Sequence, residues 1–341
     1  MSLVDTLIAK AKRGPKWVAL PECGAEKTLL AARRVLDEGV AWPLLVSPPA
    51  LIAETAKRAG VSTEGMAIAD TTDEKALEAL AQRYMYYPRR RYTLEETREK
   101  LRDPVNYAMV LAATGHADTV FCGHVNTTKT VLLAAKRCIG LREGVDAASV
   151  FALAEIPGFS GPEGNVLALA DCALNVDPNP EQLASIAIST CLSARALMGW
   201  EPRCAFLSFS THGSGSGQSV DKIVRAVEIA RERRPDLKID GELQLDAALR
   251  PEVAAAKLPA PGEVAGRANV LIFPDLNAAN IGIKMIQLFA GGFCCGHTLA
   301  GFALPVADSS RGATVEEIVG DIAMLVLDAQ KEAKACPVPQ S

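Results

Sequence analysis

Residues 17–47 read WVALPECGAEKTLLAARRVLDEGVAWPLLVS, and this stretch decides the fold class. Its two ends, residues 17–21 and 42–47, are short apolar runs with the length of buried strands. Between them, residues 26–39 place their apolar side chains on one helical face, and Gly39 is a typical helix stop. Strand, helix and strand in this order predict a parallel sheet with helices on both faces.

The same alternation continues along the chain, which has 341 residues. Further helices are expected at residues 72–83, 94–115, 180–197, 220–233 and 315–335. Further strands are expected at residues 118–122, 149–153, 165–170, 204–210 and 269–273. This length exceeds one hydrophobic core, so we expect an α/β protein with two domains of about 150–200 residues each.

Composition excludes several classes of protein. A net charge of −4 argues against a nucleic-acid-binding surface, which would be basic. Nine scattered cysteines without a C-x-x-C motif predict buried free thiols in a reducing cytoplasm. The first residues lack a signal-peptide pattern, and no apolar run reaches the 18 residues that a membrane span needs. We therefore expect a cytoplasmic protein with no nucleic-acid or membrane partner.

Two unusual loops lie in the last third of the chain. The expected strand at 204–210 leads into His212-Gly-Ser-Gly-Ser-Gly217, which could hold a phosphate with backbone N–H groups or could be a plain turn. Residues 240–246, DGELQLD, carry three carboxylates. These carboxylates could bind a hard cation, or they could form a solvated edge together with buried groups bonded to the backbone at a domain interface.

Two later segments join a strand to a helix. Residues 273–284, FPDLNAANIGIK, occupy the position where open α/β sheets bind ligands. Residues 305–312, PVADSSRG, precede Thr314 and Glu317, which fit a capping box. Ser310 and Arg311 would then lie just ahead of a helix N-terminus, where backbone donors and the helix dipole favour an anion.

Together these segments resemble the phosphotransacetylases, along nearly the whole chain. The resemblance is closest to the short single-unit members, including those used in ethanolamine breakdown. The matching runs in the C-terminal half are LSFST (207–211) with Gly213-Ser214, PDL (235–237), DGELQ (240–244), DAA (246–248), AGRANVLIFPDLN (265–277), NIG (280–282), Lys284 and PV…D…SRG (305–312). Looser matches in the N-terminal half are LPE (20–22), DPV (103–105), Gly123 and Thr127-Thr128.

The resemblance implies a particular architecture. Two doubly wound α/β domains, similar to those of isocitrate and isopropylmalate dehydrogenases, would enclose an active-site cleft. Residues 1–144 and 299–341 would form domain one. Residues 145–298 would form domain two, which would carry the dimer interface of a homodimer.

The resemblance also implies a reaction, the reversible transfer of an acetyl group between acetyl phosphate and coenzyme A. Both substrates would bind in a ternary complex, and the CoA thiolate would attack the acyl carbonyl. Ser310 would stabilise the oxyanion, Arg311 would hold the phosphate, and Glu317 would be the base at a position where the family has aspartate. No metal and no permanently bound cofactor is needed, because coenzyme A is a substrate.

Substrate binding involves further positions. The expected binding residues are Asn126, Thr127, Thr128, Lys129, Arg89, Arg90, Ser214, Asn280 and Lys284. Two arginines of the family are missing, because their positions hold Tyr87 and Leu133; Lys129 or Arg89–Arg91 could replace them. Tyr87 is one of four tyrosines in this segment, with Tyr84, Tyr86 and Tyr92, which could stack on an adenine or pack a loop.

Two alternatives therefore stay open. Ala279 and Ile283 also depart from the family pattern beside Lys284, so a propionyl or butyryl group could be the substrate. A degenerate, non-catalytic relative that binds acyl-CoA in a regulatory role is the other alternative, since losing two arginines that the family links to substrate or phosphate binding could leave only a trace of activity.

Overall fold

The computed structural model describes residues 2–331. Predictions for Met1, for a last helix continuing to residue 335 and for Cys336 therefore lie outside the described residues. The chain divides into two compact units. Unit 1 comprises Met1–Arg142 and the described part of Gly296–Ser341, and unit 2 comprises Glu143–Cys295.

Unit 1 contains a parallel sheet that fits the apolar runs of the sequence. The order of its parallel strands is β3 (Ala67–Ala69), β2 (Ala41–Val46), β1 (Lys16–Leu20), β4 (Thr119–Cys122) and β11 (Val306–Asp308). Val18, Leu45 and Val120 are fully buried in it. β10 (Phe293–Ala300) joins β11 in the antiparallel direction, at Thr298 and Ala307. The α/β class expected from the sequence is confirmed.

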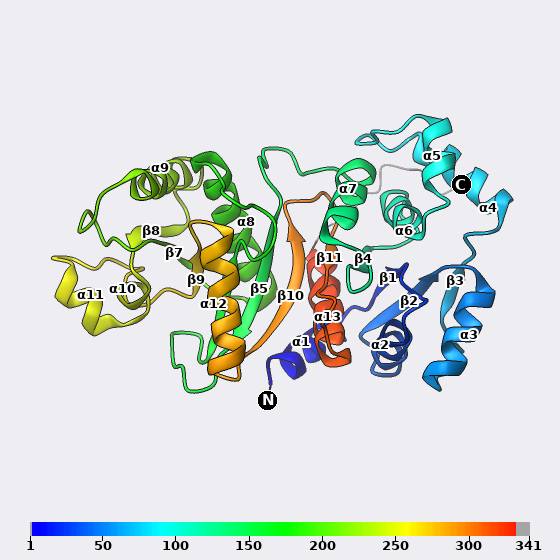
Figure 1. The fold of residues 1–341 in the computed structure, drawn as a ribbon, viewed down its shortest axis with the longest axis horizontal. Coiled ribbons are helices and arrows are strands. Elements are labelled where there is room, and N and C mark those ends of the chain that lie inside the picture. Colours follow the sequence, from blue (N-terminus) through cyan, green and yellow to red (C-terminus); the bar gives the residue numbers. More distant parts are fainter. Residues whose placement is uncertain (1, 332–341) are drawn as a thin grey trace. The chain divides into compact units, whose positions relative to one another are not determined.

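Helices cover the unit 1 sheet. They are α1 (Leu3–Ala11), α2 (Glu26–Asp37), α3 (Pro49–Ala59), α4 (Glu74–Tyr84), α5 (Leu94–Lys100), α6 (Pro104–Ala113), α7 (Thr128–Cys138) and α13 (Val315–Lys331). α13 packs against α1 and α2, although some 280 residues or more separate them in sequence. Figure 1 shows the red α13 beside the blue α1, so the C-terminal part of the chain returns to the unit where the chain begins.

The expectation of one helix over residues 94–115 is wrong. α5 ends at Lys100, and α6 begins at Pro104 after Asp103, whose side chain accepts a hydrogen bond from the backbone of Asn106 at 2.9 Å. Proline suits the first turn of a helix but breaks a helix interior. The Asp-Pro pair therefore starts a new helix at this position.

Unit 2 contains a sheet with both parallel and antiparallel strands. Its strand order is β5 (Ser149–Glu155), β6 (Val166–Ala170), β9 (Val270–Ile272), β7 (Arg203–Leu207) and β8 (Lys238–Leu243). The expectation of a purely parallel sheet fails at two pairs, because β5 runs antiparallel to β6 and β10 runs antiparallel to β11. Each pair is joined by a short loop with no helix, and parallel strands need a longer crossover.

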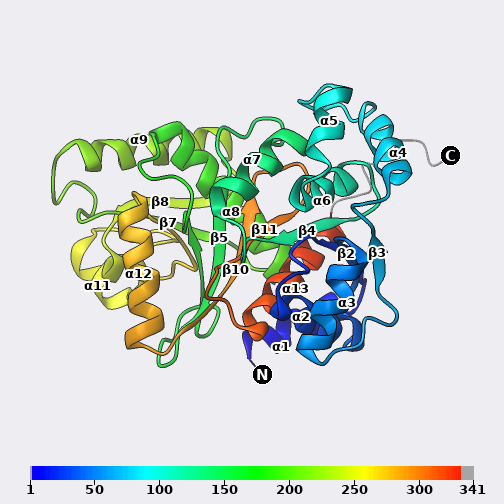
Figure 2. The same cartoon turned by 45° about the vertical axis from the view of Figure 1, so that its right-hand side comes forward.

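Five helices complete unit 2. They are α8 (Pro180–Met198), α9 (Gln218–Arg233), α10 (Leu245–Leu249), α11 (Pro251–Lys257) and α12 (Leu276–Phe289). Figure 2 labels α8, α9, α11 and α12. Within residues 2–331 no helix has the length and apolar character to cross a membrane. The eight cysteines in this range are buried and form no disulfide, as the composition predicts.

Candidate functional site

Ser310 and Arg311 lie in the loop between β11 and α13. Both are exposed, and the backbone N–H of Gly312 donates to the Ser310 hydroxyl at 3.3 Å. α13 begins four residues after Arg311 and runs for 17 residues. The loop therefore presents a hydroxyl and a guanidinium beside the positive end of a long helix, which favours an anionic ligand.

Glu317 caps α13. Its Oε2 accepts hydrogen bonds from the backbone of Thr314 at 2.7 Å and from the Thr314 hydroxyl at 3.0 Å. The Glu317 backbone donates to the same hydroxyl at 3.2 Å. The capping box predicted from the sequence is confirmed. One carboxylate oxygen of Glu317 is therefore already in use at the helix end.

A buried carboxylate forms a hydrogen bond to the loop that carries Ser310. Asp321 of α13 is fully buried; its Oδ2 accepts from the Ser309 hydroxyl at 2.9 Å and its Oδ1 from the Gly296 backbone at 2.6 Å. His297 Nδ1 lies 3.6 Å from Oδ2, which suits an ion pair but is too long for a hydrogen bond. Burial disfavours protonation of His297, but its interaction with Asp321 outweighs burial and raises the pKa of His297.

A second buried carboxylate holds the loop between β4 and α7. Glu22 accepts from the backbone of His124 and Val125, each at 3.2 Å, and from the backbone and side chain of Asn126 at 2.7 and 2.8 Å. His124 Nδ1 lies 2.6 Å from Glu22, and its Nε2 lies 2.9 Å from the Thr28 hydroxyl. Burial opposes ionisation of Glu22, but the bonds from His124 and Asn126 lower its pKa.

This second loop carries four of the expected binding residues. Asn126 is fixed by Glu22, Thr127 is the N-cap of α7, and Thr128 and Lys129 form the first turn of the helix. Thr127, Thr128 and Lys129 are exposed. They therefore surround another helix N-terminus in the same unit as Ser310 and Arg311.

Asp308 lies where the two loops meet. β11 and β4 are parallel neighbours, with Asp308 opposite Cys122, and the Ser309 backbone donates to Cys122 O at 2.8 Å. Gly123 has φ +101°, and a Cβ at this position would lie 2.3 Å from Asp308 Oδ1. Only glycine allows this approach. The parallel register thus places the loop of residues 123–127 directly beside the loop that begins at Ser309.

The positions that lack the family arginines have different surroundings. The buried Tyr87 donates its hydroxyl to Ile139 O at 2.9 Å, and its ring stacks on Tyr84 at a centroid distance of 5.9 Å. Leu133 on α7 is 45% exposed. Arg89 and Arg90 are exposed in the α4–α5 loop, and Arg90 Nη1 donates to Tyr87 O at 3.4 Å.

The tyrosines of this segment serve mainly to pack it. Tyr84, Tyr87 and Tyr92 are buried, whereas Tyr86 is 75% exposed. Of the two roles open from the sequence, packing of a loop is therefore the one seen for the three buried rings.

Three expected binding residues belong to unit 2. Ser214 is exposed in the glycine-rich loop, and its hydroxyl accepts from the Thr211 backbone at 2.9 Å. Asn280 and Lys284 are exposed on α12, four positions apart and so on one face of that helix. Asn280 and Lys284 thus lie together on helix α12, whereas Ser214 lies on a loop elsewhere in the unit.

The three carboxylates of residues 240–246 bind protein donors. Glu242 accepts from the Ser210 hydroxyl at 2.8 Å and from the Gly213 backbone at 2.7 Å. Asp240 pairs with Arg231 at 2.8 Å, and Asp246 pairs with Lys257 at 2.8 Å. Bonding of a buried carboxylate to the backbone is therefore confirmed for Glu242, which shapes the glycine-rich loop.

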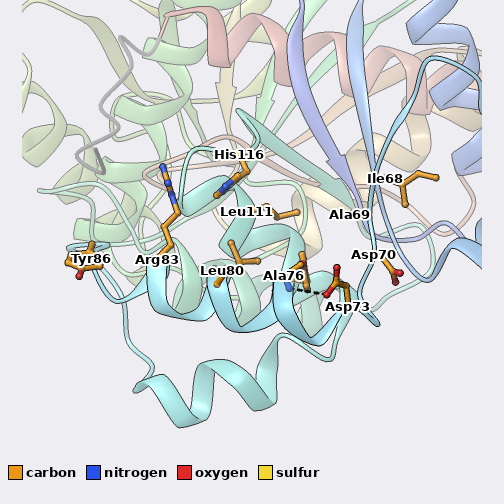
Figure 3. Close-up of a pocket in the computed structure, with 12 residues that line it drawn as sticks. Ile68, Ala69, Asp70, Asp73, Ala76, Leu80, Arg83, Tyr86, Leu111 and His116 are labelled. Carbon is orange, nitrogen blue, oxygen red and sulfur yellow. Dashed lines mark hydrogen bonds between the residues drawn. The ribbon is translucent and has the colours of Figure 1, made fainter. Parts of the chain in front are cut away.

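Unit 1 also has a cavity of about 800 Å³ between β3, α4 and α6 (Figure 3). Asp70 and Asp73 lie at one end, and Arg83 and His116 at the other. These groups already have local partners: Asp73 caps α4, and Arg83 donates to Thr114 O at 3.2 Å. None of the expected catalytic or binding residues lines this cavity.

Comparison with known proteins gives the family. Residues 2–326 match the family model described as phosphate acetyl/butaryl transferase. The phosphate acetyltransferase of Clostridium acetobutylicum is 40% identical over 334 residues, which cover 97% of this chain and 99% of that protein. The chain belongs to the phosphate acetyl/butyryl transferase family.

Solved structures agree with this family. A phosphotransacetylase from Streptococcus pyogenes is 33% identical, with a TM-score of 0.85 over 97% of this chain and 99% of that one. EutD phosphotransacetylase from Staphylococcus aureus is 29% identical, with a TM-score of 0.85 over 96% of this chain and 100% of that one. The resemblance predicted from the sequence is confirmed.

Sequence reasoning missed four residues that organise the site of this phosphate acetyl/butyryl transferase family member. Glu22, His124, His297 and Asp321 are buried or half-buried beneath the two loops. Asp321 had a visible signal, because it is an acid within the apolar stripe that contains Ile318, Ile322 and Leu325. The pairing of Glu22 with His124 had none, because 102 positions separate them in sequence.

Proposed function

We propose that this protein is a phosphate acetyltransferase, which catalyses acetyl-CoA + phosphate ⇌ acetyl phosphate + CoA. The observation that carries the proposal is the exposed Ser310–Arg311 pair at the N-terminus of α13, on a loop held by the buried Asp321. Membership of the phosphate acetyl/butyryl transferase family and full-length relatives that carry this name support it.

The chemistry follows from the charges at this loop. The thiolate of CoA attacks the acetyl carbonyl, and the carbonyl oxygen becomes negative as the tetrahedral intermediate forms. Ser310 donates a hydrogen bond to this oxygen, and the planar guanidinium of Arg311 binds the phosphate oxygens. CoA is a substrate in this scheme, and no permanently bound cofactor takes part.

The reaction also needs a base that accepts the proton of the CoA thiol. The family position holds Glu317, which we propose as a base only in a state where its carboxylate releases the two Thr314 donors. A carboxylate that accepts such bonds is a weaker base than a free one, because the bonds stabilise its charged form.

The remaining binding residues supply donors and cations for phosphate and CoA. We propose that Asn126, Thr127, Thr128 and Lys129 bind phosphate at the N-terminus of α7. Arg89, Arg90, Ser214, Asn280 and Lys284 are exposed and are proposed as contacts for CoA. The buried thiols suit a reducing cytoplasm, where we place the protein.

A steady-state assay tests the proposed reaction. Thioester absorbance is followed with CoA and acetyl, propionyl or butyryl phosphate in separate reactions. We expect turnover above about 1 s⁻¹, within the usual range of enzymes, with the highest kcat/KM for acetyl phosphate. A higher kcat/KM for butyryl phosphate would show that the protein is an acyltransferase whose preferred substrate carries a butyryl group.

One observation favours the degenerate, acyl-CoA-binding alternative. Tyr87 is buried and Leu133 is apolar, so neither position of the missing arginines offers a guanidinium. A charge-assisted hydrogen bond contributes about 1.5–3 kcal/mol, so two such losses could remove most of the activity. Binding of acetyl-CoA in calorimetry without turnover in the assay would establish this alternative.

We also propose a homodimer formed through α12. Ile281, Met285, Leu288 and Phe289 follow a helical spacing and are 56%, 52%, 76% and 82% exposed. Within α12, Ala279 is the one buried residue. Contiguous exposed apolar surface of this kind marks an interface, and a second copy of the chain presents the same helix.

The double substitution Leu288→Asp and Phe289→Asp tests the dimer. We expect it to yield a monomer in sedimentation or light scattering at micromolar concentration, because two buried charges oppose association. Val224→Asp, on an exposed position of α9 in the same unit, is the matched control and should leave the mass unchanged. A double variant that keeps the wild-type mass would exclude α12 as the interface.

A further inference from the structure

His297 of β10 lies beside Asp308, which is separated from Ser310 by one residue. Thr298 pairs with Ala307 of β11 in the antiparallel direction, so the residue before Thr298 lies beside the residue after Ala307. These two residues are His297 and Asp308. The sheet therefore brings an imidazole to the start of the loop that carries the proposed reacting groups.

The two nitrogens of the His297 ring have different surroundings. Nδ1 is buried and lies 3.6 Å from Asp321 Oδ2, the same oxygen that accepts from the Ser309 hydroxyl. The His297 side chain as a whole is 26% exposed. Because the two ring nitrogens point in different directions, burial of Nδ1 against Asp321 leaves Nε2 on the accessible side of the ring.

Carboxylates on two neighbouring elements face His297. Burial lowers the pKa of His297, but Asp321 and Glu317 of α13 and Asp308 of β11 raise it, and their effect outweighs that of burial. The imidazolium therefore persists to higher pH than that of an ordinary histidine. Both nitrogens of an imidazolium are donors, and since Asp321 lies on the Nδ1 side, the Nε2 donor remains for a ligand.

The loop of residues 309–312 has room for a second cation in its chemistry. Arg311 is the one charged residue of this loop, and the positions of the missing family arginines hold the buried Tyr87 and the apolar Leu133. Phosphate oxygens are bound most strongly by charged donors. A protonated imidazole beside the loop would therefore strengthen the binding of a phosphate group.

We propose that protonated His297 donates a hydrogen bond from Nε2 to the phosphate group of the substrate and so takes the place of a missing arginine. Asp321 is the positioning residue, because one of its oxygens faces the ring and also holds Ser309. The inference rests on the proposed function and deepens it. His297 keeps its proton throughout, so the proton of the CoA thiol still passes to Glu317.

Titration of the His297 ring by NMR tests this contact without turnover. The chain has four histidines, and His297→Gln identifies the signal of His297 by its loss. Inorganic phosphate should raise the pKa of His297 by about 1, which corresponds to tenfold tighter binding of phosphate to the protonated ring. Sodium chloride at the same ionic strength is the control for screening. The same pKa in both salts would overturn the proposal.

The KM for acetyl phosphate, measured between about pH 6 and pH 9, gives a kinetic test. The folded pKa of His297 is raised, so its charge is present at low pH and is lost as the pH rises through that pKa. The wild-type KM should therefore rise about tenfold or more over this range, which is the effect of losing one charge-assisted hydrogen bond. The change in kcat should be small, because the contact forms in the ground state and in the transition state alike.

Three variants complete the kinetic test. His297→Gln should show the higher KM at every pH, and Asp321→Asn should move the rise in KM to lower pH, which a merely structural role would not do. His116→Gln, an exposed histidine of the same unit, is the matched control with wild-type KM. A wild-type KM in His297→Gln at every pH would overturn the contact. A phosphate-dependent pKa of His297 without any wild-type turnover would instead overturn the proposed function and leave the phosphate contact in place.

Discussion

We expect Arg311→Ala to lower kcat/KM for acetyl phosphate by about tenfold to two-hundredfold, the equivalent of one charge-assisted hydrogen bond of 1.5–3 kcal/mol. The guanidinium is exposed in the loop ahead of α13, so its removal should leave the fold intact. Its planar fork binds two phosphate oxygens at once, which a single ammonium cannot do. Initial rates of thioester formation over a range of acetyl phosphate concentrations give this value.

Arg311→Lys is the matched control for this prediction. It keeps the positive charge and loses the fork, so we expect it to recover only part of the lost rate. The Tm of both variants should lie within about 2 °C of the wild type, as for surface substitutions. Wild-type kcat/KM in Arg311→Ala would mean that phosphate is held elsewhere, and the Ser310–Arg311 loop would no longer be the active site.

Glu22→Ala should lower the free energy of unfolding by at least about 1–3 kcal/mol, the cost of leaving one buried donor without its acceptor. Alanine leaves the backbone donors of His124, Val125 and Asn126 without their acceptor and leaves Nδ1 of the His124 ring without its partner. Urea denaturation at pH 7 measures the loss. Glu22→Gln is the matched variant and should lose less, because its amide oxygen still accepts from some of these donors.

The stability contribution of Glu22 also depends on pH. The pKa of Glu22 in the folded protein is lower than its ordinary value of 4.5. Glu22 therefore stabilises the fold at pH values above its pKa in the unfolded chain, and this stabilisation is lost as the pH falls through its pKa in the folded protein. The wild type should therefore lose stability on acidification below about pH 5, more steeply than Glu22→Gln. A loss below 1 kcal/mol in Glu22→Ala would show that the loop of residues 123–127 does not depend on this carboxylate.

Much of the fold follows from local sequence patterns. Strands β1, β2 and β4 and helices α2, α8 and α9 lie close to their expected positions. Their apolar residues are spaced so that they can be buried together, and this spacing is visible in the sequence. The break at Asp103-Pro104 shows the limit of periodicity. Helix-forming residues lie on both sides of it, and the Asp-Pro pair separates α5 from α6.

Strand direction was harder to predict than strand position. β5 and β6 are short apolar runs like the parallel strands, and the length of their connection is the feature that makes them a hairpin. The candidate site shows the same limit. The Ser310–Arg311 loop and the cap at Glu317 are local and could be predicted, whereas Asp308 meets Gly123 only through the register of β4 and β11.

The most direct test of the central claim is the reverse reaction of the wild-type protein. Acetyl-CoA is supplied with increasing phosphate, and free CoA is titrated with a thiol reagent. Acetyl transfer predicts CoA release that saturates with phosphate and yields one acetyl phosphate for each CoA. Acetyl-CoA that binds in calorimetry but releases no CoA at any phosphate concentration would contradict the account.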